Sequence, residues 1–234
     1  MKDIWTKEKY DNYVNDLKKL QDLKYLEFNK GITPNTKEMI GVRMPLLKKK
    51  AREISKSDVA SFINYYKGEY FEETMMLGLV IGYTLNINIY DKYLEFFSKE
   101  ISDWAVCDGS VKVMKLIKTE RNHFYPFVLK MLKTNNEYQV RLALVILLNY
   151  YITDEYILKL IEICKKVKSD KYYINMALAW LICEMYIFYP DLVDVLISDK
   201  YLDKFVLNKT ISKISDSYRV SDECKKNLKL RGKK

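Results

Sequence analysis

Residues 137–151 read EYQVRLALVILLNYY, a run of aliphatic side chains with a single arginine inside it. Residues 172–186, YYINMALAWLICEMY, are similarly apolar, and the spacing elsewhere is helical, as at Ile157, Leu160, Ile161 and Cys164. We therefore predict helices nearly throughout. Their expected ranges are 4–19, 45–55, 58–66, 70–84, 89–100, 103–118, 123–133, 136–151, 154–167, 171–188, 191–198, 203–215 and 221–229.

The composition supports an all-α fold. Hydrophobic residues make up 49% of the 234 residues and charged residues 30%, which is typical of a folded globular protein. Only 7 Gly and 4 Pro are present, too few to punctuate the many turns of a sheet protein of this length.

From residue 58 the expected helices form pairs, and the start of each pair lies about 31 to 37 residues after the start of the one before it. This is the period of an α-solenoid. We therefore predict an α–α superhelix of HEAT-like helical repeats, with the second helix of each pair on the concave side. A single domain, 1–234, is expected, because no Ser/Gly linker interrupts the array. It would comprise an N-terminal helical cap at 1–56, about five helix pairs at 57–229 and a basic tail at 230–234.

Several classes of function are excluded or disfavoured by residue counts. One histidine, His123, cannot build a multi-histidine metal site, and we expect no metal and no organic cofactor. The 4 cysteines contain no CxxC pair, which favours a reducing cytoplasm. The start of the chain is polar, and the longest apolar run, 142–152, is too short to cross a membrane. The sequence lacks GxxxxGK[ST], GxGxxG and GxSxG motifs, so nothing supports a nucleotide cradle or a hydrolase elbow.

Large polar and amphipathic residues stand out in the second helices. Trp104 and Asp108 lie one helical turn apart, and Trp180 and Glu184 have the same spacing. Arg141 lies about one repeat from each tryptophan, so Trp104, Asp108, Arg141 and Trp180 are candidates for one cleft. A structural Asp108–Arg141 ion pair beneath two core tryptophans is the alternative, and a buried carboxylate needs a partner in either case.

The charges indicate what such a cleft would bind. Two indoles and a carboxylate suit a cation. The chain as a whole carries a net charge of +9, which suits an anion. Basic residues cluster toward both ends, at Lys48, Lys49, Lys50 and Arg52 and at Lys209, Lys213, Arg219, Lys225, Lys226, Lys229, Arg231, Lys233 and Lys234. A basic rim around an acidic and aromatic centre is expected of a protein that binds DNA with a positively charged lesion.

Four segments resemble the AlkD-like DNA alkylation repair proteins, a superfamily of HEAT-like repeats. They are Gly41-Val42-Arg43-Met44-Pro45 with the basic helix behind it, Asp103-Trp104-Ala105-Val106-Cys107-Asp108, Arg141 early in its apolar helix, and 173–180 with Glu184 and Pro190. The stretch from Asn208 to Val220 also looks like the family's C-terminal end, so the resemblance covers roughly residues 8 to 225.

The resemblance implies a DNA glycosylase that excises cationic alkylpurines, 3-methyladenine and 7-methylguanine, from double-stranded DNA. It puts the catalytic roles on Trp104, Asp108 and Arg141 and a second cleft tryptophan at Trp180. Asp108 would stabilise the developing sugar cation, and Arg141 would hold Asp108 or a phosphate. We also expect Arg43, Lys48, Lys49, Lys209, Lys213 and Arg219 to bind DNA, and the protein to act as a monomer.

The chain departs from the family around Trp180. Asn175-Met176 stands where a basic residue is usual, Ala179 replaces a glycine, and Cys183 takes the place of an arginine. These changes remove phosphate contacts, so two alternatives remain open: a non-catalytic DNA-structure binder of the same superfamily, and a helical scaffold that binds proteins. Three further residue sets have plainer interpretations, Gly78 and Gly82 as close helix packing, His123 as a cap or surface residue, and Cys107 as core.

Overall fold

The computed structural model describes residues 3–33, 37–198 and 201–231, and within these ranges the protein is all-α. The described residues contain no strand, only one isolated bridge between Glu38 and Tyr70. The expected fold class, an all-α helical-repeat protein, is confirmed. The chain divides into two compact units, Met1–Glu120 and Arg121–Lys234. The single domain expected at 1–234 stays a prediction, and residues 232–234 of the expected basic tail lie outside the described residues.

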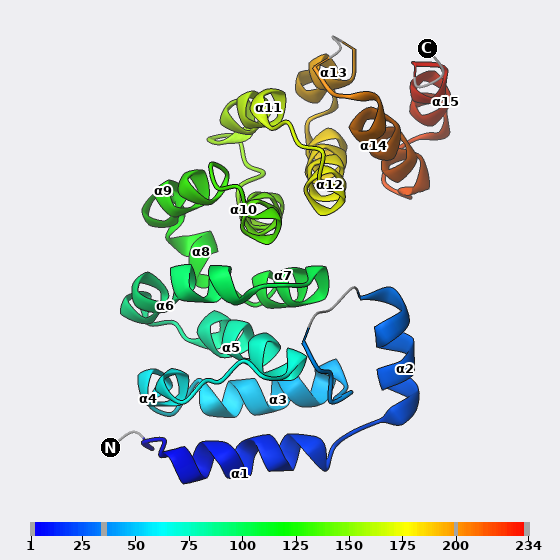
Figure 1. Ribbon diagram of the computed structural model, residues 1–234. Helices are drawn as coiled ribbons and strands as arrows, with labels where there is room; N and C mark the ends of the chain where they lie inside the picture. The colour runs from blue at the N-terminus through cyan, green and yellow to red at the C-terminus, as the bar shows by residue number, and fades with distance from the viewer. Residues whose placement is uncertain (1–2, 34–36, 199–200, 232–234) are drawn as a thin grey trace. The chain divides into compact units, whose positions relative to one another are not determined.

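Helix α5 is the centre of the first unit, where it packs against α3 and α7 (Figure 1). Every residue from Phe71 to Gly82 is buried, because neighbouring helices cover α5 on all sides. Helices α4 and α6 also pack on α5. The helices of this unit are α1 (Lys7–Lys18), α2 (Leu23–Ile32), α3 (Met44–Ile54), α4 (Val59–Asn64), α5 (Phe71–Tyr83), α6 (Ile87–Glu100), α7 (Trp104–Val111) and α8 (Leu116–Thr119).

In the second unit α12 lies between α10 and α14, while α9 packs on α10, and α11 and α13 pack on α12 (Figure 1). The long apolar helices α10 and α12 supply most of the buried side chains, as their sequences predict. The helices of this unit are α9 (Arg121–Met131), α10 (Glu137–Tyr150), α11 (Ile157–Lys166), α12 (Tyr172–Phe188), α13 (Pro190–Ser198), α14 (Lys204–Asp216) and α15 (Asp222–Arg231).

Two elements differ from the expected helices. Helix α2 was not predicted: its apolar residues, Leu23, Leu26, Phe28 and Ile32, do not share one face of the helix, and none of them is buried. The helix expected at 103–118 is two helices, α7 and α8, joined by a tight turn in which the N–H of Met114 donates to the carbonyl of Val111. Met114 in this turn is completely buried, and the turn contains neither glycine nor proline.

Glycines in α5 allow its neighbours to approach closely, which confirms the packing role expected for Gly78 and Gly82. A Cβ at Gly78 would lie 2.2 Å from Ser110 Oγ on α7 and 2.5 Å from Phe97 Cζ on α6. A Cβ at Gly82 would lie 2.7 Å from Val113 Cγ2. Gly78 therefore sets the distance between α5 and the helix that carries Trp104 and Asp108.

The variant Gly78→Ala is expected to destabilise the protein. Overpacking costs about 1–3 kcal/mol, and the clash at Gly78 belongs to the upper end. The better helix propensity of alanine offsets only about 1 kcal/mol of this cost, so the free energy of unfolding should fall by about 2 kcal/mol. Urea denaturation measures it. The matched control is Gly31→Ala on α2, where a Cβ meets nothing within 4 Å, and it should leave stability equal or slightly higher. Equal stabilities of the two variants would contradict this packing role.

A buried carboxylate at the start of α5 fixes the loop that leads into α3. Glu72 is 1% exposed and accepts hydrogen bonds from the N–H groups of Ile40, Gly41 and Val42 at 2.9, 2.7 and 3.0 Å. Gly41 has a φ of +94°, and a Cβ there would lie 2.7 Å from the Cβ of Leu26 on α2. Glu72 and Gly41 together hold Arg43 at the first turn of α3 and α2 close beside it.

Helices long and apolar enough to cross a membrane do not occur in the described part of the chain.

Candidate functional site

Trp104 and Asp108 lie on α7, one turn apart on the same face. Asp103 caps the helix, because its carboxylate accepts from the N–H of Ala105 at 2.6 Å, and Trp104 is the first helical residue. Both Trp104 and Asp108 are half-buried, so solvent reaches both side chains. Next to Asp108, Gly109 packs against Met44 and Met75, which anchors this part of α7 on α3 and α5.

The indole of Trp104 is oriented by α2. Its Nε1 donates a hydrogen bond to the main-chain carbonyl of Ile32, the last residue of that helix, at 3.2 Å. The carbonyls at the end of a helix lack intrahelical partners, so this one is available to an outside donor. This contact could not be predicted, because α2 itself was not among the expected helices.

Arg43 is exposed, but it is already engaged with α2. Its Nε donates to Asp22 Oδ2 at 2.8 Å, and its guanidinium lies 5.4 Å from the centre of the Tyr25 ring. The N–H of Tyr25 and then Arg43 lower the pKa of Asp22 below its usual value. On the following helix Lys48 is half-buried and Lys49 is exposed. DNA binding by these three residues stays a prediction.

Arg141 is buried and ties the start of α12 to α10. Its Nη1 donates to the main-chain carbonyl of Tyr173 at 3.0 Å, and the residue is only 6% exposed. From the same helix, Glu137 Oε1 accepts from the N–H of Tyr173 at 2.8 Å. Arg141 thus has a structural contact, and the catalytic role expected for it stays a prediction. It meets the first turn of α12, whereas Trp180 lies about two turns further along that helix.

Trp180 lies in a pocket of about 310 Å³ with two of the expected DNA-binding cations. Lys213 Nζ on α14 is 6.0 Å from the centre of the indole ring. Arg219 Nη2 contacts both oxygens of Glu184, at 2.7 and 2.9 Å. Lys209, half-buried on α14, lies 5.7 Å from the Phe205 ring and does not line this pocket.

Cys183 lines the same pocket, at the position where related sequences are expected to carry arginine. The residue is 4% exposed, and burial raises the pKa of its thiol to about 11, so it is neutral near pH 7 and a poor nucleophile. Lys213 and Arg219 bring positive charge to this place from other elements. Glu184 and Asp216 also line the pocket, so its two cations are matched by two carboxylates.

The first unit places Trp104 and Asp108 together, and the second places Trp180 together with Lys213 and Arg219. The expectation that Asp108 and Arg141 meet in one cleft stays a prediction. His123 is exposed on α9, and Cys107 is fully buried, as expected for surface and core residues. Throughout the described ranges, no three His, Cys, Asp or Glu side chains gather where they would hold a metal ion.

Each unit is built of packed helices, so the chain is an all-α helical-repeat protein. A model of the DNA alkylation repair enzyme family matches residues 13–214. The chain therefore belongs to the DNA alkylation repair enzyme family, and the resemblance seen in its sequence is confirmed. Comparison with curated proteins and with solved structures gave no match.

Proposed function

We propose that this protein is a DNA glycosylase that hydrolyses the N-glycosidic bond of cationic alkylpurines in duplex DNA. The observation that carries the proposal is the position of Asp108, half-buried and one turn from Trp104, in a chain of the DNA alkylation repair family. A fully buried Asp108 would have favoured a purely structural role. A half-buried carboxylate keeps a path for substrate while its surroundings strengthen its charge interactions.

The reaction needs little from the protein because the substrate is already labile. An N-alkylated purine carries a positive charge and leaves C1′ of the deoxyribose as a neutral base. The C1′–N bond breaks, positive charge develops on the sugar, and a water oxygen then bonds to C1′. Asp108 stabilises the sugar cation and accepts the proton that the water loses, which leaves an abasic site.

The other residues support this step in the proposal. The indoles of Trp104 and Trp180 pack on the sugar and backbone and attract the same positive charge. Arg141 holds Asp108 or the phosphate beside the lesion. Lys213 and Arg219 bind phosphates next to Trp180.

The proposal is tested by incubating the protein with methylated duplex DNA and measuring free bases by chromatography. We expect release of 3-methyladenine and 7-methylguanine above the spontaneous rate. A duplex with 8-oxoguanine, a neutral lesion, is the charge control and should release no base. No release of the cationic bases by protein that still binds the duplex would leave a DNA-structure binder as the function.

Replacing the two cations beside Trp180 should weaken DNA binding uniformly across sequences. For the double variant Lys213→Gln/Arg219→Gln we expect the slope of log K against log salt to fall by about 2, because each lost phosphate contact removes about 0.9. Fluorescence anisotropy with labelled duplex DNA measures the slope.

The matched control for this variant is Lys92→Gln/Lys118→Gln, which removes the same charge from two exposed lysines outside the Trp180 pocket. Its slope should equal that of the wild type. Equal losses in the two double variants would mean that net charge alone, rather than the Trp180 pocket, governs binding.

A further inference from the structure

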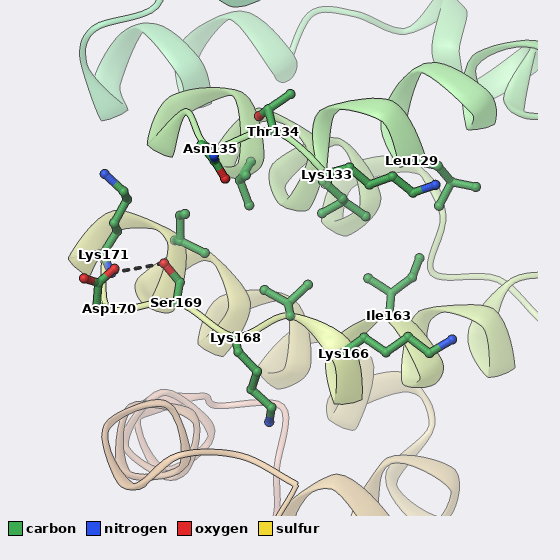
Figure 2. Close-up of a pocket in the computed structure, with 14 residues that line it drawn as sticks. Leu129, Lys133, Thr134, Asn135, Ile163, Lys166, Lys168, Ser169, Asp170 and Lys171 are labelled. Atoms are coloured by element: carbon green, nitrogen blue, oxygen red, sulfur yellow. Dashed lines mark hydrogen bonds between the residues drawn. The ribbon is translucent and has the colours of Figure 1, made fainter.

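A second pocket lies in the same unit, between the loop that joins α9 to α10 and the loop that joins α11 to α12 (Figure 2). Its volume is about 670 Å³, within the usual range for ligand sites. It shares no lining residue with the Trp180 pocket.

Aliphatic side chains line the middle of this pocket. Leu129, Leu132, Ile163 and Val167 are half-buried there, so they keep apolar area in contact with solvent. Val140 and Ile174, both buried, complete the apolar lining. A partner that covers this area gains about 25 cal/mol for each Å² of apolar surface removed from water.

Lysine side chains lie at both ends of the aliphatic centre. In Figure 2 Lys133 and Lys166 extend toward one end, and Lys171 lies at the other end beside Asp170. Lys168 points away, and its Nζ donates to the main-chain carbonyl of Tyr201. The end with Lys133 and Lys166 thus offers two exposed ammonium groups. Glu162, which lies near Lys166, is paired with Lys165 and does not line this pocket.

The walls of the pocket are fixed before any ligand arrives. Ser169 Oγ accepts from the N–H of Lys171 at 3.1 Å. The main-chain carbonyl of Ser169 accepts from Nδ2 of the buried Asn175 at 3.0 Å. Glu137 and Arg141 hold Tyr173 from α10. A pre-ordered site loses less conformational entropy on binding, which favours affinity.

We propose that this pocket binds an acidic peptide segment of a partner protein, with one large apolar side chain seated among the aliphatic residues and carboxylates on Lys133 and Lys166. The side-chain amide of Asn135 lines the pocket, and the hydroxyl of Ser169, which accepts from Lys171, can still donate to the peptide backbone. The lining favours a peptide over a nucleic acid, because none of the described residues that form it is an aromatic on which a base stacks, or an arginine.

The test uses fluorescein-labelled octapeptides with four aspartates around a central leucine, isoleucine or phenylalanine, and anisotropy measured against the full-length protein. We expect saturable binding by at least one peptide. Serine in place of its apolar residue should weaken binding about tenfold, which is the loss of about 1.4 kcal/mol of contact. Absence of saturable binding for all three peptides, or equal binding of the serine peptide, overturns the proposal.

Charge-reversal variants distinguish peptide binding at this pocket from nonspecific attraction to the positive charge of the whole protein. Lys133→Glu/Lys166→Glu should weaken peptide binding at least about tenfold, whereas Lys118→Glu, on an exposed lysine of the first unit, should not. The double variant should excise alkylated bases at the wild-type rate, so failure here and failure of the proposed glycosylase give different results. A loss of duplex DNA affinity as large as the loss of peptide affinity would assign the pocket to nucleic acid instead.

Discussion

The variant Asp108→Asn is expected to release alkylated bases about 10³-fold more slowly than the wild type. Two unit charges 4 Å apart at an effective dielectric constant of 20 interact by about 4 kcal/mol, and asparagine removes that interaction with the sugar cation. Asparagine also cannot accept the proton of the attacking water. The measurement is the single-turnover rate of base release from duplex DNA with one 7-methylguanine.

Two controls make the result for Asp108→Asn specific. The control Asp191→Asn removes one negative charge from an exposed position on α13 and should leave the excision rate unchanged. Affinity of Asp108→Asn for undamaged duplex should equal or slightly exceed the wild-type value, because a negative charge has been removed. A rate within a factor of about three of the wild type would remove Asp108 from the chemistry.

The variant Glu72→Ala is expected to lower the free energy of unfolding by about 4 kcal/mol, since it leaves three buried N–H groups without an acceptor at about 1–3 kcal/mol each. That is a large share of the roughly 5–15 kcal/mol that stabilises a typical domain. Urea denaturation followed by circular dichroism measures the loss. The matched control is Glu69→Ala, an exposed glutamate three residues away, with an expected change within about 0.5 kcal/mol. A loss below about 1 kcal/mol for Glu72→Ala would show that the loop does not depend on this carboxylate.

Most helices were predictable because their apolar residues follow the helical period or fill the helix completely. Helix α10 is the clearest example, with buried residues from Gln139 to Leu147. Helix α2 was not predictable, because it is held by contacts at its ends rather than by a buried face: the N–H of Asp22 donates to the carbonyl of Gly41, and Trp104 Nε1 reaches the carbonyl of Ile32. These two contacts depend on the tertiary structure and leave no pattern in the local sequence. The local signal, Asp22, caps the helix by accepting from the N–H of Tyr25, but a cap residue alone does not predict a helix.

The candidate site was predictable to the extent that it lies on one helix. The spacing of Trp104 and Asp108 fixes their common face on α7 without any tertiary information. The contact of Arg141 with Tyr173 and that of Arg219 with Glu184 join residues more than 30 positions apart, so spacing gave no signal for them. The same holds for Glu72, whose burial follows from a loop folded over the start of α5.

One measurement tests directly whether this protein breaks the bond between a cationic purine and its sugar. Excess wild-type protein is mixed with a duplex that contains a single 7-methylguanine, and free base is followed over time against the same duplex alone. We expect a rate at least about 100-fold above the spontaneous one, which corresponds to about 2.7 kcal/mol of transition-state stabilisation. A rate equal to the spontaneous one, with the duplex fully bound, would contradict the account.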